Sequence, residues 1–498
     1  MEIKKVKLTQ AQCALDMGDG SERGFYVNQD YLLRKMKKVH RGISLMYTYY
    51  PKDAGWPVRA CEAFPKNKDG GAWNFPYEDY FPYMGGLKNG LNGNRNGEPF
   101  CYMKEIRQRG QDVVLTITVD PHLEDEYLVA VAKDLRPYGR LLLRINHECT
   151  GTWFCFNKRA TYQELADFFV RFAKILKVYA PNVKTILCAG MYLENEGKIE
   201  MEDIFLEAHK IADIWSGDNY LSLHWGWPND IAEKGNPNMA AYDVDAVYEK
   251  ARKTVLRLRE ITGQDKPFVM SEMNADGDVT GAVVQANTMR YFMDRLEKEE
   301  DKWLTAFTLY QFRDDGRLGL EVTDPNNPEV GIEQPLMDIY RKKLHKPFFS
   351  QPIVDDGKIS LPARLRWGGA EDAEGVSMPL HFENQPVFAE AYFNGELEAA
   401  NLMLELGGYW FYKKPGVKFV DFMTLFWDKP LTGETDMELH IFAPPASGLN
   451  DYPGQENGIN VDDVPNGDWM TDTYSELKAL PEIRLRFEEP ALAKRYEE

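Results

Sequence analysis

Between about residue 42 and residue 344, short apolar runs alternate with longer segments of helical periodicity, and no other feature constrains the fold as much. The runs are rich in β-branched and aromatic residues, as in 42–50 and 112–119. The segments between them space their apolar residues three and four apart, as in 161–179. Strands that alternate with helices of this length indicate βαβ units and therefore a parallel sheet.

Eight strands are expected to close into a barrel rather than form an open sheet, because the chain has no glycine-rich nucleotide loop of the G-x-G-x-x-G or G-x-x-x-x-G-K-[ST] type. Seven of them are expected near residues 43, 112, 140, 183, 220, 267 and 304, and the eighth either in 73–84 or in 24–27. The helices between them are expected at 124–135, 161–179, 201–215, 244–262, 282–298 and 334–344.

The pattern changes near residues 346–352, and past this point the helical period is lost. Strands are expected at 364–367, 388–393, 402–412, 419–427 and 437–442, which indicates a β-sandwich. The predicted architecture is therefore a (β/α)8 TIM barrel over residues 1–345 followed by a β-sandwich over 350–498. The sandwich could bind carbohydrate, but its apolar content favours a module that packs against the barrel.

The charge balance disfavours several classes of partner. The chain has 59 Lys and Arg against 78 Asp and Glu, a net charge of −19, which disfavours nucleic acid and anionic membrane surfaces. No apolar run is long enough to span a membrane, and no leader peptide is visible, so a cytoplasmic location is expected, or secretion if a leader has been removed. Most of the six cysteines are expected to be free thiols in a reducing compartment. Oligomeric state is not predicted.

In an α/β barrel, functional side chains follow the carboxyl ends of the strands. Glu148 follows the strand expected near residue 140, and Glu272 follows the strand expected near 267. One such glutamate alone would more simply be a salt bridge or a helix cap. Two of them, beside the indoles of Trp153 and Trp225, favour glycoside hydrolysis, which needs one protonated and one ionised carboxyl group.

Residues 144–154, Arg-Ile-Asn-His-Glu-Cys-Thr-Gly-Thr-Trp-Phe, resemble the fourth-strand motif R-x-x-H-E-x-x-G-x-W-[FY] of glycoside hydrolase family 26. Residues 268–273 resemble the strand-7 motif of clan A, the retaining (β/α)8 hydrolases that include this family. The resemblance covers roughly residues 40–345. It implies that Glu148 is the general acid/base, that Glu272 is the nucleophile, and that their carboxyl groups lie about 5–5.5 Å apart.

The resemblance also implies the reaction and the substrate-binding residues. The expected substrate is a β-linked glycan of the mannan, xylan or glucan type, cleaved by double displacement. His147 is expected to contact sugar hydroxyls and His224 to contact the nucleophile, whereas Arg144 could be a sugar ligand or a buried partner of a carboxylate. Asp120 and His122 could bind sugar or cap a helix. The full expected set of substrate-binding residues is His147, Trp153, His224, Trp225, Asp120, His122, Arg144, Tyr310 and Gln311.

The electrostatic expectation follows from these assignments. Burial against Trp153 and the charge of Glu272 are expected to raise the pKa of Glu148, and hydrogen bonds from His224 and a neighbour are expected to keep Glu272 ionised. The aromatic run at 73–83 could line the cleft or pack beneath a loop.

The competing interpretations are an exo-acting β-glycosidase of the same clan, a barrel that binds glycans without cleaving them, and a metal-dependent barrel hydrolase or isomerase. The last would need a His/Asp set, which 45–50 does not offer. Cys149, Cys155 and His147 match no usual zinc spacing. The sequence therefore predicts no metal and no cofactor.

Overall fold

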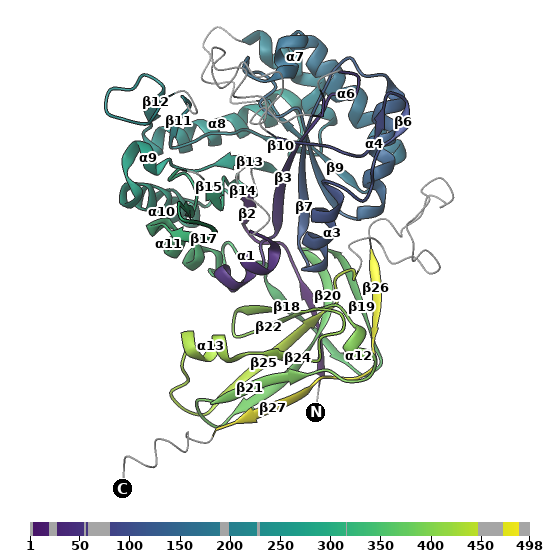
Figure 1. Ribbon diagram of the computed structural model, residues 1–498, viewed down its shortest axis with the longest axis vertical. Coiled ribbons are helices and arrows are strands. Elements are labelled where there is room, and N and C mark those ends of the chain that lie inside the picture. The colour runs from purple at the N-terminus through teal and green to yellow at the C-terminus, as the bar shows by residue number, and fades with distance from the viewer. Residues whose placement is uncertain are drawn as a thin grey trace.

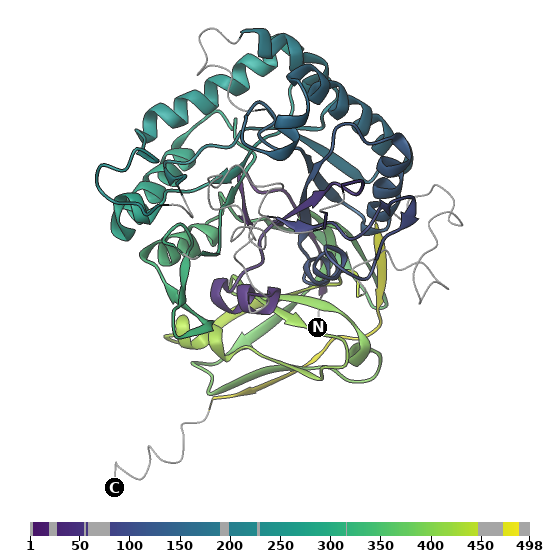
Figure 2. The ribbon, with the colours of Figure 1, turned by 45° about the horizontal axis from the view of Figure 1, so that its top comes forward.

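The computed structural model describes residues 3–18, 27–53, 56–57, 80–189, 199–226, 230–314, 316–446 and 472–487. A ring of helices surrounds a central parallel sheet, and a second body of antiparallel sheets lies against one end of that ring (Figures 1 and 2). The amino-terminal strand lies in the second body, which also holds the carboxyl-terminal strands, and the chain passes from that strand into the barrel (Figure 1).

Eight parallel strands close the barrel, because the last pairs with the first and the first pairs with the second. The prediction of a (β/α)8 barrel is confirmed. In ring order the strands are β2 (Ala14–Gly18), β3 (Gly42–Tyr49), β7 (Asp112–Val119), β8 (Leu141–Ile145), β9 (Val183–Cys188), β10 (Ile214–Ser216), β13 (Phe268–Met273) and β14 (Ala306–Leu309).

Amphipathic helices cover the outside of the barrel, and none of those described is long and apolar enough to cross a membrane. The Thr161 hydroxyl accepts a hydrogen bond from the Glu164 backbone N–H, so α6 begins with a capping box, and α8 ends at Gly263 with φ of 66°. The helices are α1 (Gln29–Met36), α3 (Phe100–Gln108), α4 (Asp125–Leu135), α5 (Cys155–Arg159), α6 (Tyr162–Tyr179), α7 (Ile199–Ile211), α8 (Val244–Thr262), α9 (Gly277–Thr280), α10 (Ala282–Lys298) and α11 (Pro335–Leu344), with a 3-10 turn η3 (Arg136–Tyr138).

The strand that closes the ring is β2, which neither expected segment contains. Asp16 in the middle of β2 hides the apolar pattern, but its carboxylate is buried and forms an ion pair with Arg41. Of the two expected segments, 24–26 and 73–79 lie outside the described residues. The described end of the second contains only β4 (Phe81–Pro82), which pairs beside β3 and does not close the ring.

The sixth strand was also predicted in the wrong place. It is β10, whereas residues 222–224 form β11 (Ser222–His224), which pairs antiparallel with β12 (Met239–Ala241) in a hairpin outside the barrel. Ile211 and Trp215 continue the apolar spacing of α7, so the sequence shows no break between the helix and the strand. Other short strands in the barrel half are β5 (Leu87–Lys88), β6 (Leu91–Asn92), β15 (Arg313–Asp314), β16 (Glu321–Asp324) and β17 (Asn327–Glu333).

The carboxyl-terminal body is a sandwich of two antiparallel sheets. Apolar side chains of both sheets, such as Leu404 of the larger and Ala391 of the smaller, share one core. The larger sheet runs β18 (Ile353–Ile359), β1 (Ile3–Leu8), β20 (Asp372–Phe382), β25 (Thr435–Phe442), β22 (Leu402–Leu406), β23 (Tyr409–Lys413). Within it, β19 (Ala363–Gly369) also pairs with β20, and β26 (Thr473–Leu477) pairs with β19. The smaller sheet runs β24 (Phe419–Asp421), β21 (Phe388–Tyr392), β27 (Glu482–Arg486). The segment expected as a strand at 419–427 is β24 followed by a helix, α13 (Met423–Asp428), and α12 (Glu396–Ala399) precedes β22.

Residues 3–8 were expected in the barrel, but β1 lies between β18 and β20 of the sandwich. An apolar cluster also joins the two bodies, with Val39 of the barrel packed among Val6, Trp367 and Trp410 of the sandwich. In the pairing of β1 with β18, Ile3 lies opposite Ile359. Such a distant pairing leaves no pattern in the local sequence, so hydrophobic periodicity could not assign β1 to its sheet.

We therefore expect Val6→Asp to lower the free energy of unfolding by more than about 3 kcal/mol, because it buries an unpaired carboxylate. Val6 is 2% exposed and lies at the centre of this seam. Chemical denaturation measures the change. Lys4→Ala is the matched control in the same strand, since the ion pairs of Lys4 with Glu438 and Asp355 are exposed to solvent, and it should cost less than about 1 kcal/mol. Equal losses in the two variants would contradict the placement of β1.

Candidate active site

Glu148 stands in a sharp turn at the end of β8. Asn146 and Glu148 have φ of 47° and 49°, in the left-handed region that non-glycine residues rarely adopt. The Asn146 side chain holds this turn by accepting from the backbone N–H of Val119 at 2.6 Å and donating to its carbonyl at 3.0 Å. The strained turn brings Glu148 to the carboxyl end of the barrel, where active sites of this fold lie.

Trp153 holds the Glu148 carboxyl group. Its indole N–H donates to Glu148 Oε2 at 2.9 Å, and the rest of the side chain is 40% exposed. A Cβ at Gly151 would lie 2.7 Å from the Trp153 ring, so only glycine lets the indole fold back in this way. The glycine and tryptophan of the motif therefore serve one purpose, which is to orient Glu148.

Glu272 occupies the end of β13 and is bonded on both carboxylate oxygens. Arg144 Nη2 donates to Oε1 at 2.7 Å, and the Tyr220 hydroxyl donates to Oε2 at 3.0 Å. Arg144 is fully buried, so it is a partner of carboxylates beneath the site, the second of its two expected roles. Thr116 fixes the guanidinium further by accepting from Nε at 2.7 Å.

A third carboxylate, Asp218, shares the same guanidinium. Arg144 Nη1 donates to Asp218 Oδ2 at 3.0 Å, and Asp218 Oδ1 accepts from the Glu272 backbone N–H at 2.9 Å. The misplacement of the sixth strand explains why Asp218 and Tyr220 were not predicted, since both directly follow β10. Glu148, Glu272 and Asp218 would together carry three negative charges against the single positive charge of Arg144. One of the three carboxyl groups is therefore favoured to stay protonated.

Burial and like charge decide which group holds that proton. Burial raises the pKa of Glu148 well above its usual value, and the charges of Asp218 and Glu272 raise it further. Burial also raises the pKa of Glu272, to about 7, but Arg144 opposes this shift. Glu148 is therefore the stronger holder of the proton, as expected, whereas Glu272 ionises near neutrality rather than well below it.

His147 directly precedes Glu148 in the chain and is fully buried. Its Nε2 is 3.1 Å from the Tyr80 hydroxyl and 3.6 Å from Glu272 Oε1. Its ring packs on Phe154 with a centroid distance of 4.5 Å. Burial and the positive charge of Arg144 hold the pKa of His147 well below its usual range, so the imidazole is neutral.

His224 does not contact Glu272, so that prediction is wrong. It lies in β11, outside the barrel, and its Nε2 is 2.5 Å from Asp230 Oδ1. Because the sixth strand ends at Ser216, the aromatic side chain that follows it closely is Tyr220, which takes the position expected for His224.

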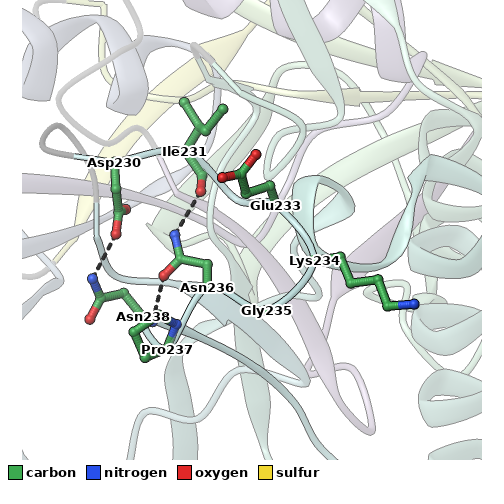
Figure 3. Close-up of a pocket in the computed structure, with 8 residues that line it drawn as sticks. All are labelled: Asp230, Ile231, Glu233, Lys234, Gly235, Asn236, Pro237 and Asn238. Atoms are coloured by element: carbon green, nitrogen blue, oxygen red, sulfur yellow. Dashed lines mark hydrogen bonds between the residues drawn. The ribbon is translucent and has the colours of Figure 1, made fainter.

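The β11–β12 hairpin carries Trp225, which is half-buried and whose backbone N–H donates to the Asn238 carbonyl at 2.8 Å. A pocket at the tip of this hairpin lies among residues 230–238, where Asn238 donates to Asp230 and Asn236 donates to the Ile231 carbonyl (Figure 3). Neither catalytic candidate lines it. The pocket in this hairpin is thus separate from the carboxyl groups of Glu148, Glu272 and Asp218.

The structure gives Asp120 and His122 partners away from the carboxyl cluster. Asp120 Oδ2 pairs with Arg159 at 2.8 Å, and Asp120 Oδ1 accepts from the His122 backbone N–H at 3.0 Å. The His122 ring reaches the Arg159 carbonyl at 3.0 Å. Neither residue caps α4, whose N-cap is Glu124 without a side-chain hydrogen bond, so the capping interpretation is wrong. Asp120 instead bonds the turn before the helix and pairs with Arg159.

At the end of β14, Tyr310 is half-buried and meets Tyr220 edge to face, with ring centroids 6.4 Å apart. Tyr310 therefore lies beside the hydroxyl that contacts Glu272. Gln311 is buried, and its Oε1 has no hydrogen-bond partner among the described residues.

No set of three or more His, Cys, Asp or Glu side chains in the described ranges could hold a metal ion. The two strand-end glutamates and their neighbours can supply proton transfer and nucleophilic attack by carboxyl groups.

We expect Glu148→Gln to stabilise the protein at alkaline pH. The folded-state pKa of Glu148 is raised, so its stabilising contribution is complete below the unfolded value of about 4.3 and is lost as the pH rises through the folded value. Glutamine keeps the shape and removes the charge. The gain in Tm over the wild type should be small at pH 5 and grow toward pH 9, by about 2–4 °C for each kcal/mol relieved.

Differential scanning fluorimetry across this pH range measures the gain. Glu329→Gln, at an exposed position of β17, is the matched control and should shift Tm equally at all pH values. A gain for Glu148→Gln that does not depend on pH would contradict the buried, proton-holding environment.

No protein-family model matches the sequence, and no curated protein matches it. Among solved structures, the chain is similar to a GH39 enzyme from Xanthomonas axonopodis pv. citri, with a TM-score of 0.48, 11% identity, and coverage of 88% of this chain and 96% of that one. It is also similar to a monomeric β-xylosidase from Caulobacter crescentus (TM-score 0.45, 12% identity, coverage 89% and 98%) and to a GH26 β-mannanase from Bacteroides ovatus (0.42, 14%, 68% and 90%). Because all three TM-scores are below 0.5, only this chain's own side chains bear on its function.

Proposed function

We propose that this protein is a retaining glycoside hydrolase that cleaves a β-linked glycan or oligosaccharide of the mannan, xylan or glucan type. The observation that carries the proposal is the contrast between the surroundings of two carboxyl groups, the half-buried Glu148 at the end of the fourth strand and the buried Glu272 at the end of the seventh. Arg144 and Tyr220 bond Glu272, whereas among the described residues only Trp153 bonds the Glu148 carboxyl. One group is thus prepared to act as an anion and the other to give a proton.

The reaction proceeds in two steps. In the first, Glu148 gives its proton to the leaving oxygen while the Glu272 carboxylate attacks the anomeric carbon, the glycosidic bond breaks, and a glycosyl ester forms. In the second, Glu148 takes a proton from water as that water attacks the same carbon, and the ester bond to Glu272 breaks. This scheme requires the two carboxyl groups to lie about 5–5.5 Å apart.

Asp218 and Arg144 serve both steps by charge. Asp218 shares Arg144 with Glu272, so the guanidinium neutralises the nucleophile only in part and leaves it reactive. The charge of Asp218 also raises the pKa of Glu148, which favours the acid form needed in the first step.

A screen of nitrophenyl glycosides and β-linked polysaccharides tests the proposal, with Glu148→Gln and Glu272→Gln as inactive controls. We expect release of nitrophenol or reducing ends by the wild type on at least one β-linked sugar. Glycan binding by the wild type without hydrolysis would instead support the non-catalytic barrel.

A further inference from the structure

The arrangement of His147, Tyr80 and Glu272 holds an unused hydrogen-bond donor at the centre of the site. His147 is neutral and fully buried, so its ring has one N–H group. Its Nδ1 is buried and has no hydrogen-bond partner among the described residues. Its Nε2 faces two oxygens, Tyr80 Oη at 3.1 Å and Glu272 Oε1 at 3.6 Å.

These surroundings decide which nitrogen carries the proton. A proton on Nδ1 would leave a buried donor unpaired and would turn the Nε2 lone pair toward the carboxylate of Glu272. A proton on Nε2 leaves only an unpaired acceptor at Nδ1 and directs the N–H toward Tyr80 Oη and Glu272. The Nε2–H form of His147 is therefore the stable one.

The Tyr80 hydroxyl then accepts from His147, so its own proton is free for another partner. Within the described part of the chain, His147 is the one group that hydrogen-bonds this hydroxyl. Burial and the nearby charge of Glu272 raise the pKa of Tyr80 well above its usual value, so the phenol stays protonated across the working pH range. Tyr80 is thus a permanent donor beside the nucleophile.

The charge that develops in the reaction selects the acceptor. Positive charge spreads onto the ring oxygen of the sugar in the oxocarbenium-like transition state, so a donor aimed at that oxygen would oppose the reaction. The nearest hydroxyl is the 2-hydroxyl, which is bonded to the carbon next to the reacting carbon and carries none of this positive charge. Its oxygen can accept from Tyr80 while its proton is donated to Glu272.

We propose that Tyr80 is a catalytic residue, whose hydroxyl donates to the 2-hydroxyl of the sugar bound at the cleavage site, completing a hydrogen-bond chain from His147 through Tyr80 and the sugar to Glu272. This role rests on the proposed glycosidase function. Bonds to the 2-hydroxyl strengthen as the transition state forms, so the effect falls on kcat more than on KM.

Tyr80→Phe tests the role, because it removes the hydroxyl and keeps the ring that packs near His147 and Phe154. We expect kcat on an aryl β-glycoside to fall about 10²-fold, the loss found when one transition-state donor is removed, with KM changed little. Tyr83→Phe is the matched control in the same loop: the Tyr83 hydroxyl donates to Asp134 at 3.1 Å, away from the carboxyl pair, and kcat should stay near wild type.

A 2-deoxy aryl glycoside separates sugar contact from a merely structural role. If Tyr80 acts on the 2-hydroxyl, the wild type and Tyr80→Phe should hydrolyse the 2-deoxy substrate at the same rate. A tenfold or greater difference that persists on the 2-deoxy substrate would overturn the assignment, as would a wild-type kcat for Tyr80→Phe on the parent substrate. A wild type without activity on any glycoside would overturn the proposed function itself, and this inference with it.

Discussion

Replacing Glu272 by Gln is expected to reduce turnover on every glycoside by about 10⁴–10⁶-fold, the range seen when one member of a catalytic set is removed. Glutamine keeps the volume of the side chain and can still accept from Tyr220, but it cannot attack the anomeric carbon as an anion. Because no glycosyl ester can form, good and poor leaving groups should suffer alike. Steady-state kinetics on aryl glycosides with leaving groups of different pKa measures the loss.

Glu321 provides a matched control for this substitution. Both glutamates are buried, and Glu321 also has an arginine and a tyrosine among its partners, with Arg313 at 2.6 Å and the Tyr31 hydroxyl at 3.0 Å. Its third partner is Lys35, at 3.9 Å. Glu321→Gln should therefore cost stability in the same way and leave kcat within a few-fold of the wild type. A comparable loss of kcat in both variants would show that buried charge, and not nucleophilic attack, explains the effect at Glu272.

Most of the barrel could be predicted because its helices and strands show their hydrophobic period within their own residues. Long amphipathic helices such as α6 and α8 show their period and their caps directly in the sequence. Six of the eight barrel strands lie where apolar runs predicted them, namely β3, β7, β8, β9, β13 and β14. The strands that failed are those whose pattern depends on distant partners. Asp16 breaks the pattern of β2 because its partner, Arg41, lies 25 residues away. β1 shows no sign of the sandwich that it joins.

In the candidate site too, residues on clearly patterned strands could be predicted, and residues placed by distant contacts could not. Glu148 and Glu272 could be proposed as the catalytic pair because each stands at the end of a clear strand and within a recognisable motif. Asp218 and Tyr220 depended on the end of β10, which is only three residues long, so an error in that strand moved the expected contact to His224. The position of Tyr80 depends on the path of a loop, which tertiary contacts set rather than periodicity.

Removing the Glu148 side chain should separate the two steps of the reaction. In Glu148→Ala, substrates with poor leaving groups should lose about 10²–10⁴-fold in rate, because their departing oxygen needs a proton. Substrates with good leaving groups need none, so their first step should remain fast. The second step still lacks its base, so these substrates should give a burst of aglycone about equal to the enzyme present, followed by slow turnover.

Sodium azide provides a decisive test of this assignment. The space left by the side chain admits the small anion, which attacks the glycosyl ester without needing a base, so turnover of good substrates should recover and yield a β-glycosyl azide. The pH profile should change as well. The wild type should gain activity as Glu272 ionises near pH 7 and lose it at higher pH as Glu148 loses its proton, and the variant should keep the first limb and lack the second. Equal losses on good and poor leaving groups, with no azide product, would show that Glu148 is not the acid and base of this reaction.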